Sequence, residues 1–328
     1  MKSLKYICAV LFLLAGMPDI QGQTTDMGPV PFVNIVANAR SAGMGGASTA
    51  VSADAYSIYN NPSANLFGAN RGEAAYSYLP WMSDVNDGNK MHSFAGFFKI
   101  DNKQSMSVGY RHFTGNKIDI IDNSGNSGGS FTPAEWSLNL GYSRKIIDKM
   151  AVSLAIGYIS SDLGTFDDAE KATALSFNIG MLYTNDLCWV EGGSWSLGLN
   201  LTDIGSKIQY LEEKYALPTV IKLGGAVVLP FSEDHTLECA LDLGMQLSPS
   251  DASDIMANLG AEYFFLKHGF LRAGYRFIGR SSGDENFASV GCGVKVGPVK
   301  GDFSYWLADS DSPLKNTFCL TVGISFGK

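Results

Sequence analysis

Apolar residues alternate with small or polar residues in repeated runs along most of the chain. A representative run combines apolar Trp136, Leu138, Leu140 and Tyr142 with intervening Ser137, Asn139, Gly141 and Ser143. The same alternation recurs over residues 150–158, 175–183, 195–201, 221–229 and 318–326. Successive side chains of a strand point to opposite faces, so a period of two predicts strands with one apolar face.

Fourteen such runs can be counted, and their length separates two classes of β protein. They begin near residues 71, 91, 103, 134, 149, 173, 194, 219, 236, 254, 268, 285, 299 and 316. Most runs are about 10–12 residues long, close to the roughly 9–11 residues that a tilted strand needs to cross a bilayer. Strands of soluble proteins cluster at about 5–6 residues. The sequence therefore predicts an all-β transmembrane antiparallel β-barrel of about 14 strands. A soluble β-sandwich, which shares the alternation, is the alternative.

The joints between the runs alternate in character. One set is mostly short, at residues 101–103, 147–149, 266–268 and 297–298, with somewhat longer members at 185–193 and 230–235. The other set is longer and polar, at residues 81–90, 115–133, 162–172, 205–218, 248–253, 279–284 and 309–315. Short periplasmic turns opposite longer outer loops are typical of outer-membrane barrels. We therefore expect an outer-membrane location, contact with outer-membrane lipid, and both termini in the periplasm.

The stretch before the first run, residues 23–70, differs in composition from the rest. Between residues 40 and 66 it is rich in Gly, Ala and Ser and has too few large apolar side chains to build a core of its own. Small residues allow a backbone to approach its surroundings closely. We expect this stretch to plug the lumen of a barrel formed by residues 71–328. Asn61 is expected to cap a short turn begun by Pro62, and Arg40 to pair with an acidic group on the inner wall.

The first 22 residues have the pattern of a secretory signal peptide. Lys2 and Lys5 precede an apolar run over residues 6–16, and small residues follow near Gly22. Charged residues make up 17% of the chain, and the formal net charge is −8. The low charged fraction suits an exterior that faces lipid. The acidic balance, without a basic patch, argues against a nucleic-acid partner.

The serine and histidine motifs give only weak indications of a catalytic or metal site. Residues 125–129 contain the letters of a nucleophile elbow, but they lie in a Gly/Ser/Asn loop and not in a strand-to-helix turn. The four histidines lack the i, i+4 spacing of a metal pair on a helix. His92 and His112, on neighbouring strands, are expected to be girdle or lumen residues. We therefore predict no catalytic residues.

The cysteines and the acidic loops are the remaining candidates for a metal or redox site. The cysteines beyond the leader have spacings that match neither a zinc site nor a redox pair: Cys188, Cys239, Cys292 and Cys319. Two acidic stretches in proposed outer loops, residues 167–168 and 309–311, leave a divalent-cation site open, although solvated loop charge is the simpler interpretation. We predict no metal site and no cofactor.

Several stretches together resemble a known family of outer-membrane barrels. The sequence Gly43-Met-Gly-Gly, followed by Asp54 and Asn60-Asn-Pro-Ser, resembles the N-terminal hatch of FadL-like barrels. The fuller run from Pro31 to Gly45 resembles the PorV/PorQ family of type IX secretion proteins within that class. Further stretches are more similar to PorV than to PorQ: residues 77–81, 129–135, 141–145 and 203–207.

This resemblance implies a non-enzymatic barrel that receives cargo with C-terminal sorting domains from the type IX translocon barrel and passes it to attachment-complex proteins. The implied plug or hatch residues are Arg40, Gly43, Gly45, Gly46, Asp54, Asn60, Asn61 and Pro62. Candidate partner-facing residues of the outer loops are Pro80, Trp81, Met82, Phe131, Pro133 and Tyr210. The exposed apolar tip at residues 79–82 is expected either in the lipid headgroup layer or on a partner surface. The alternative function implied by the wider FadL-like class is transport of small hydrophobic molecules across the outer membrane.

Overall fold

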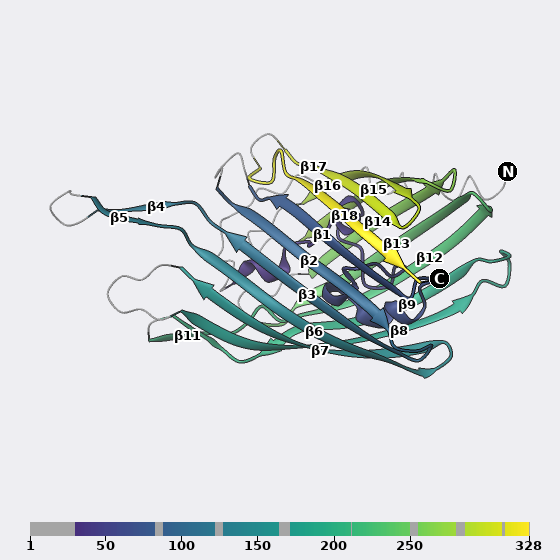
Figure 1. Cartoon of the computed structure of the whole chain (residues 1–328), viewed down its shortest axis with the longest axis horizontal. Coiled ribbons are helices and arrows are strands. Elements are labelled where there is room, and N and C mark those ends of the chain that lie inside the picture. Colours follow the sequence, from purple (N-terminus) through teal and green to yellow (C-terminus); the bar gives the residue numbers. More distant parts are fainter. Residues whose placement is uncertain are drawn as a thin grey trace.

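The computed structural model describes residues 30–82, 88–121, 127–163, 171–210, 212–249, 255–279, 286–309 and 312–327, and these form a closed antiparallel barrel (Figure 1). Within the described residues, fourteen strands make up the barrel. They are β1 (Gly72–Pro80), β2 (Lys90–Lys99), β3 (Gln104–Thr114), β6 (Ala134–Ile147), β7 (Met150–Asp162), β8 (Ala172–Asp186), β9 (Ser194–Gly205), β12 (Val220–Ser232), β13 (His235–Gln246), β14 (Ile255–Phe265), β15 (Gly269–Ile278), β16 (Phe287–Val296), β17 (Val299–Leu307) and β18 (Phe318–Phe326).

The barrel closes because its first strand pairs with its last. β1 pairs antiparallel with β18 from Gly72 opposite Phe326 to Tyr78 opposite Leu320. The remaining neighbours follow the chain from hairpin to hairpin. Every barrel strand therefore has a partner on both sides, which satisfies the backbone groups that lipid is unable to satisfy. The prediction of a closed antiparallel barrel is confirmed.

Strand faces follow the alternation read from the sequence. In β6, Leu138, Leu140 and Tyr142 are exposed on the outside, whereas Ser137 and Asn139 are buried inside. Large apolar side chains are exposed in the same way on β7, β8, β13 and β18. Strands of 9–15 residues with this outer surface match the dimensions of the bilayer core. Among the described residues, the structure has no helix long and apolar enough to span a membrane.

The two ends of the barrel differ. Short turns connect β2 to β3, β6 to β7, β12 to β13, β14 to β15 and β16 to β17. These turns lie at one end of the barrel, which we call the short-turn end. The opposite, long-loop end has two further hairpins, β4 (Ile118–Ile121) with β5 (Ser127–Phe131) and β10 (Ile208–Tyr210) with β11 (Glu213–Tyr215). Figure 1 shows β4–β5 projecting far beyond the barrel wall. The sequence had indicated only polar loops at these two places, because strands of 3–5 residues are too short to show the period-two pattern of a lipid-facing strand.

Residues 30–70, the N-terminal segment, lie inside the barrel (Figure 1). The segment contains four short helices: η1 (Pro31–Asn34), α2 (Ala39–Gly43), α3 (Ser57–Asn60) and η2 (Pro62–Leu66). The Asn38 side chain caps α2 by accepting a hydrogen bond from the Ser41 amide. Asn61 caps η2 in the same way, and Pro62 occupies its first position. α2 contacts β15 to β18, and η2 contacts β6 to β8, so the segment reaches opposite parts of the wall.

Candidate functional site

Glycines on the segment and on the wall allow two backbones to touch. Gly45 and Gly46 have positive φ angles of 63° and 83°, which favour glycine. A Cβ atom on Gly45 would lie 2.5 Å from the backbone nitrogen of Tyr275. On the wall, a Cβ atom on Gly274 would lie 2.1 Å from the Gly45 nitrogen, and one on Gly260 would lie 2.5 Å from the Met44 carbonyl oxygen. The predicted Gly-Met-Gly-Gly motif is thus the point at which the segment is pressed against β14 and β15.

Arg40 joins the segment to two acidic residues of the wall. Its Nε and Nη2 atoms donate to the two carboxylate oxygens of Glu262 at 3.1 and 3.0 Å, and Nη2 also donates to Glu238 at 2.8 Å. Nη1 donates to the Ser52 carbonyl at 2.6 Å and lies 3.5 Å from Asp54. Burial alone would lower the pKa of Arg40, but the carboxylates of Glu262, Glu238 and Asp54 raise this pKa well above its ordinary value. The guanidinium therefore remains charged.

The register of β13 and β14 explains why a cation stabilises this part of the wall. Glu238 on β13 lies directly opposite Glu262 on β14, so two carboxylates face each other across one strand pair. Like charges at such positions destabilise a sheet. Glu262 also accepts a hydrogen bond from Arg272 Nε at 2.5 Å, and Arg272 Nη1 lies 2.8 Å from the Asp302 carboxylate on β17. We call Arg40, Glu238, Glu262, Arg272 and Asp302 the latch, because they connect the segment to the wall through buried ion pairs.

A second group of hydrogen bonds holds the middle of the segment. Asp242 on β13 accepts from the backbone amides of Ser48 and Thr49 at 2.8 and 2.9 Å and from the Thr49 hydroxyl at 2.8 Å. Asn61 donates to the carbonyls of Thr49 and of Met181 on β8, at 3.0 and 2.9 Å. The Asn60 carbonyl accepts from Asn200 on β9. Asp54 turns inward within the segment, where it accepts from the Tyr56 amide at 2.8 Å.

An apolar layer fills the lumen at the long-loop end. Phe32 of η1 is fully buried in it, together with side chains from the ends of many strands. Trp306 is the largest wall residue in the layer. Its ring lies 5.3 Å from Trp81 in an edge-on contact and 4.7 Å from Phe287 in a stacked one. The bore thus ends in a packed aromatic and aliphatic layer, not in an open mouth.

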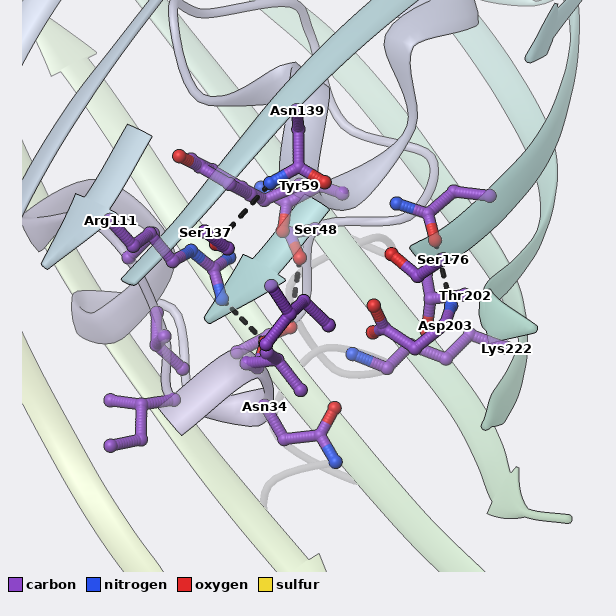
Figure 2. Close-up of a pocket in the computed structure, with 18 of the residues that line it drawn as sticks. Asn34, Ser48, Tyr59, Arg111, Ser137, Asn139, Ser176, Thr202, Asp203 and Lys222 are labelled. Carbon is purple, nitrogen blue, oxygen red and sulfur yellow. Dashed lines mark hydrogen bonds between the residues drawn. The ribbon is translucent and has the colours of Figure 1, made fainter. Parts of the chain in front are cut away.

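Below this layer the described residues enclose a polar cavity and a charged pocket. The first, of about 60 Å³, lies between the apolar layer and the latch, and its walls are mainly polar (Figure 2). The second, of about 270 Å³, lies at the short-turn end beside the latch and is lined by charged residues that include Glu73, Lys295 and Lys300. From the long-loop end to the short-turn end, the order is therefore apolar layer, polar cavity, latch and charged pocket.

Sequence comparison adds the identity of the family. The profile of the family described as type IX secretion system protein PorV matches residues 19–253 of the 328-residue chain. The chain belongs to the PorV family. No curated protein matches the chain in sequence. Family membership places this PorV-family chain among the outer-membrane proteins of type IX secretion.

Solved structures agree with the fold of this PorV-family barrel. The Pseudomonas putida toluene transporter TodX matches with a TM-score of 0.60 and 12% identity, over 89% of this chain and 98% of that chain. The Ralstonia pickettii toluene transporter TbuX gives 0.55 and 11%, over 88% and 98%. At these identities the likeness concerns the fold alone. The resemblance to the PorV family is confirmed.

The predicted partner-facing residues of the PorV-family barrel occupy different environments. Pro80 is buried, and half-buried Trp81 and Met82 pack against the apolar layer, so this tip faces the lumen and does not extend outward. Tyr210 packs there as well. Phe131 and Pro133, by contrast, lie at the base of the projecting β4–β5 hairpin and are half-exposed. The structure thus separates residues that the sequence had grouped together.

The histidines and cysteines do not gather into one site. His92 accepts or donates a hydrogen bond with the Tyr76 hydroxyl at 2.7 Å and lies opposite His112 on β3. The four cysteines that the structure describes, Cys188, Cys239, Cys292 and Cys319, are free. Over the part of the chain that the structure describes, no group of three or more His, Cys, Asp or Glu side chains is arranged to hold a metal ion. The acidic pair at residues 167–168, residues 310–311 of the second acidic stretch and residues 125–126 of the Gly/Ser loop lie outside the described residues, whereas residues 127–129 belong to β5.

Proposed function

We propose that this PorV-family barrel receives cargo with C-terminal sorting domains from the type IX translocon barrel and passes it to attachment-complex proteins. In this proposal the long-loop end faces the outside of the cell and both termini face the periplasm, as longer loops and an even strand number favour. The apolar outer wall meets lipid and the translocon barrel. Cargo is recognised without bond chemistry.

The filled lumen is the observation that carries this proposal. The apolar layer around Phe32, the latch at Arg40 and the wall contact at Gly45 each occupy the bore at a different level. A helix with its side chains is about 10 Å wide, and the described residues of the segment fill the bore at these three levels. Cargo therefore has to be held at the outer surface of the barrel and not inside it.

The β4–β5 hairpin offers a contact surface outside the membrane. It forms a two-stranded sheet of its own, and Figure 1 shows it standing clear of the barrel. Ile118 is exposed there, beside the half-exposed Phe131 opposite it in the register. A free-standing hairpin presents unpaired strand edges, and such edges bind extended segments of partner chains. Pro133 sets the base of this hairpin, where its carbonyl accepts from the Gly115 amide at 2.8 Å.

Transport of small hydrophobic molecules is the competing function. The similar structures TodX and TbuX are named toluene transporters. In this chain, however, an apolar molecule that passed the layer around Phe32 would enter a cavity lined by Arg111, Asp203 and Lys222. Burying those charges against an apolar ligand would remove their polar surroundings at a cost of several kcal/mol. The lining of the lumen therefore favours the secretion role.

Replacement of residues 118–131 by a short Asn-Gly turn tests the proposal in the native cell. If the hairpin holds cargo, we expect loss of a binding hot spot of about 2 kcal/mol, or roughly 30-fold weaker capture. Cargo with sorting domains should then accumulate in the periplasm, as measured by immunoblots of periplasm and medium. The matched control replaces residues 188–192, a mostly exposed turn at the short-turn end, by the same Asn-Gly turn. Normal secretion by the first variant and by a full deletion strain, together with loss of toluene uptake in the deletion strain, would support transport instead.

A further inference from the structure

The polar cavity between the apolar layer and the latch contains more positive than negative charge. Its charged lining residues come from four strands: Arg111 of β3, Asp203 of β9, Lys222 of β12 and Arg276 of β15. Three cations and one carboxylate therefore line the space, and Asp242 of β13, which lies diagonally across the strand pair from Lys222, adds a second carboxylate beside it. Neutral polar groups complete the lining, among them Ser137, Asn139, Ser176, Asn178 and Asn258. Figure 2 shows Arg111 on one side of this space and Asp203 with Lys222 on the other.

Lys222 lacks a fixed partner. Its Nζ atom makes no hydrogen bond and no ion pair within 4.0 Å with any residue that the structure describes. Two exposed lysines do have such partners: Lys171 pairs with Asp162 at 3.2 Å, and Lys267 with Asp234 at 3.0 Å. An ammonium group in a cavity is costly unless a counter-charge or water solvates it. The space in front of Lys222 therefore favours a negatively charged occupant.

Arg111 is oriented toward the same space by the N-terminal segment. Its Nη1 atom donates to the Val33 carbonyl at 2.5 Å, and its guanidinium lies 3.7 Å from the centre of the Tyr59 ring. These two contacts fix the plane of the group. The side chain is 95% buried, and its Nε atom has no hydrogen-bond partner among the described residues. A buried guanidinium donor without an acceptor is unusual, and an anion in the cavity would supply one.

A β-bulge places Asp203 beside these cations. Its φ angle is +56°, in the left-handed region that favours glycine, and the register between β8 and β9 shifts at this point. The Asn178 side chain accepts from the Asp203 amide at 2.7 Å, and the Thr219 hydroxyl donates to its carbonyl at 2.9 Å. Such bulges re-aim a side chain, and backbone strain is often found where function requires a position. Asp203 and Asp242 together reduce the excess positive charge around the cavity without cancelling it.

We propose that this cavity is a binding site for one small anion, either a tetrahedral oxyanion or a short carboxylate, held by Lys222 and Arg111, with Arg276 adding positive charge. The volume of about 60 Å³ accommodates roughly four to six water-sized groups, which corresponds to phosphate, sulfate or acetate. Guanidinium and ammonium groups bind such oxygens through charge-assisted hydrogen bonds. This site is independent of cargo recognition at the outer surface.

Equilibrium dialysis of the purified full-length protein in detergent tests the site. Radiolabelled phosphate, sulfate and acetate are used as separate probes in a chloride-free buffer, with incubation long enough for exchange past the apolar layer. We expect saturable binding of one anion per chain. Preference for phosphate and sulfate identifies an oxyanion site, and preference for acetate identifies a carboxylate site. Absence of saturable binding for all three probes would overturn the proposal.

Variants at Lys222 localise the binding. A charge-assisted hydrogen bond contributes about 1.5–3 kcal/mol, so Lys222→Gln is expected to weaken binding at least about tenfold. Lys222→Arg, which keeps the charge, should retain it. Lys103→Gln, at an exposed turn outside the lumen, is the matched control. Heat-modifiable migration in gels verifies that each variant is folded. Binding by folded Lys222→Gln equal to that of Lys103→Gln would show that the anion binds elsewhere, contrary to the proposal.

Discussion

Arg40→Met is expected to lower the free energy of unfolding by about 3–5 kcal/mol, the range found when one partner of a buried ion pair is removed. Arg40 neutralises two carboxylates, Glu238 and Glu262, that lie opposite each other in adjacent strands. Without it, Arg272 remains as the guanidinium on Glu262, and Glu238 loses its ion pair. The change is measured as the midpoint of guanidinium unfolding of the barrel in detergent, followed by tryptophan fluorescence.

A conservative variant separates the charge of Arg40 from its hydrogen-bond geometry, and a second variant at an exposed arginine is the control. Arg40→Lys keeps a cation but loses the two parallel bonds to Glu262, so an intermediate loss is expected. Arg144→Met removes an arginine from the exposed side of β6 and should leave the midpoint nearly unchanged. If Arg40→Met unfolded at the same denaturant concentration as Arg144→Met, the ion pairs of the latch would not hold the segment to the wall.

Much of the barrel could be predicted because the alternation within each strand shows which residues face lipid and which face the lumen. A residue such as Leu140 that faces lipid has to be apolar, and its neighbours Asn139 and Gly141 face the lumen, so the period-two pattern is repeated in every spanning strand. All fourteen predicted starts differ from the observed ones by two residues or fewer. No such constraint acts outside the bilayer. The β4–β5 hairpin, with Gly and Ser in one strand, therefore read as a loop.

The lumen was less predictable because its contacts join residues far apart in sequence. The expectation that Arg40 pairs with acidic wall residues agrees with the structure, but the partners lie 198 and 222 residues away. Glu238 and Glu262 could be identified only once the register of the β13–β14 hairpin was known. The position of Trp81 against the apolar layer was not predictable for a related reason, since a large aromatic residue at a strand end fits an interface as well as a packed mouth. That the segment acts as a movable plug or hatch remains a prediction.

Gly274→Ala is expected to displace the N-terminal segment from the wall. The added methyl carbon would lie 2.1 Å from the backbone of Met44 and Gly45, far inside van der Waals contact. Overpacking of a tight core typically costs about 1–3 kcal/mol. Here the cost should be at least that large, because backbone atoms of the segment and of β15 both have to move. Released from the wall, the segment would expose Arg40, the only trypsin site between Lys5 and Arg71.

Trypsin treatment of the folded barrel in detergent, followed by mass spectrometry, measures this release as cleavage after Arg40. Gly301→Ala is the matched control, because a Cβ atom at that wall position has nothing within 4 Å. We expect rapid cleavage in Gly274→Ala and protection in Gly301→Ala, with increased ion conductance across planar bilayers in the first variant only. Equal protection of the two variants would mean that the segment tolerates a methyl group at β15. Close backbone contact would then not be what keeps the lumen closed, and the latch alone would have to do so.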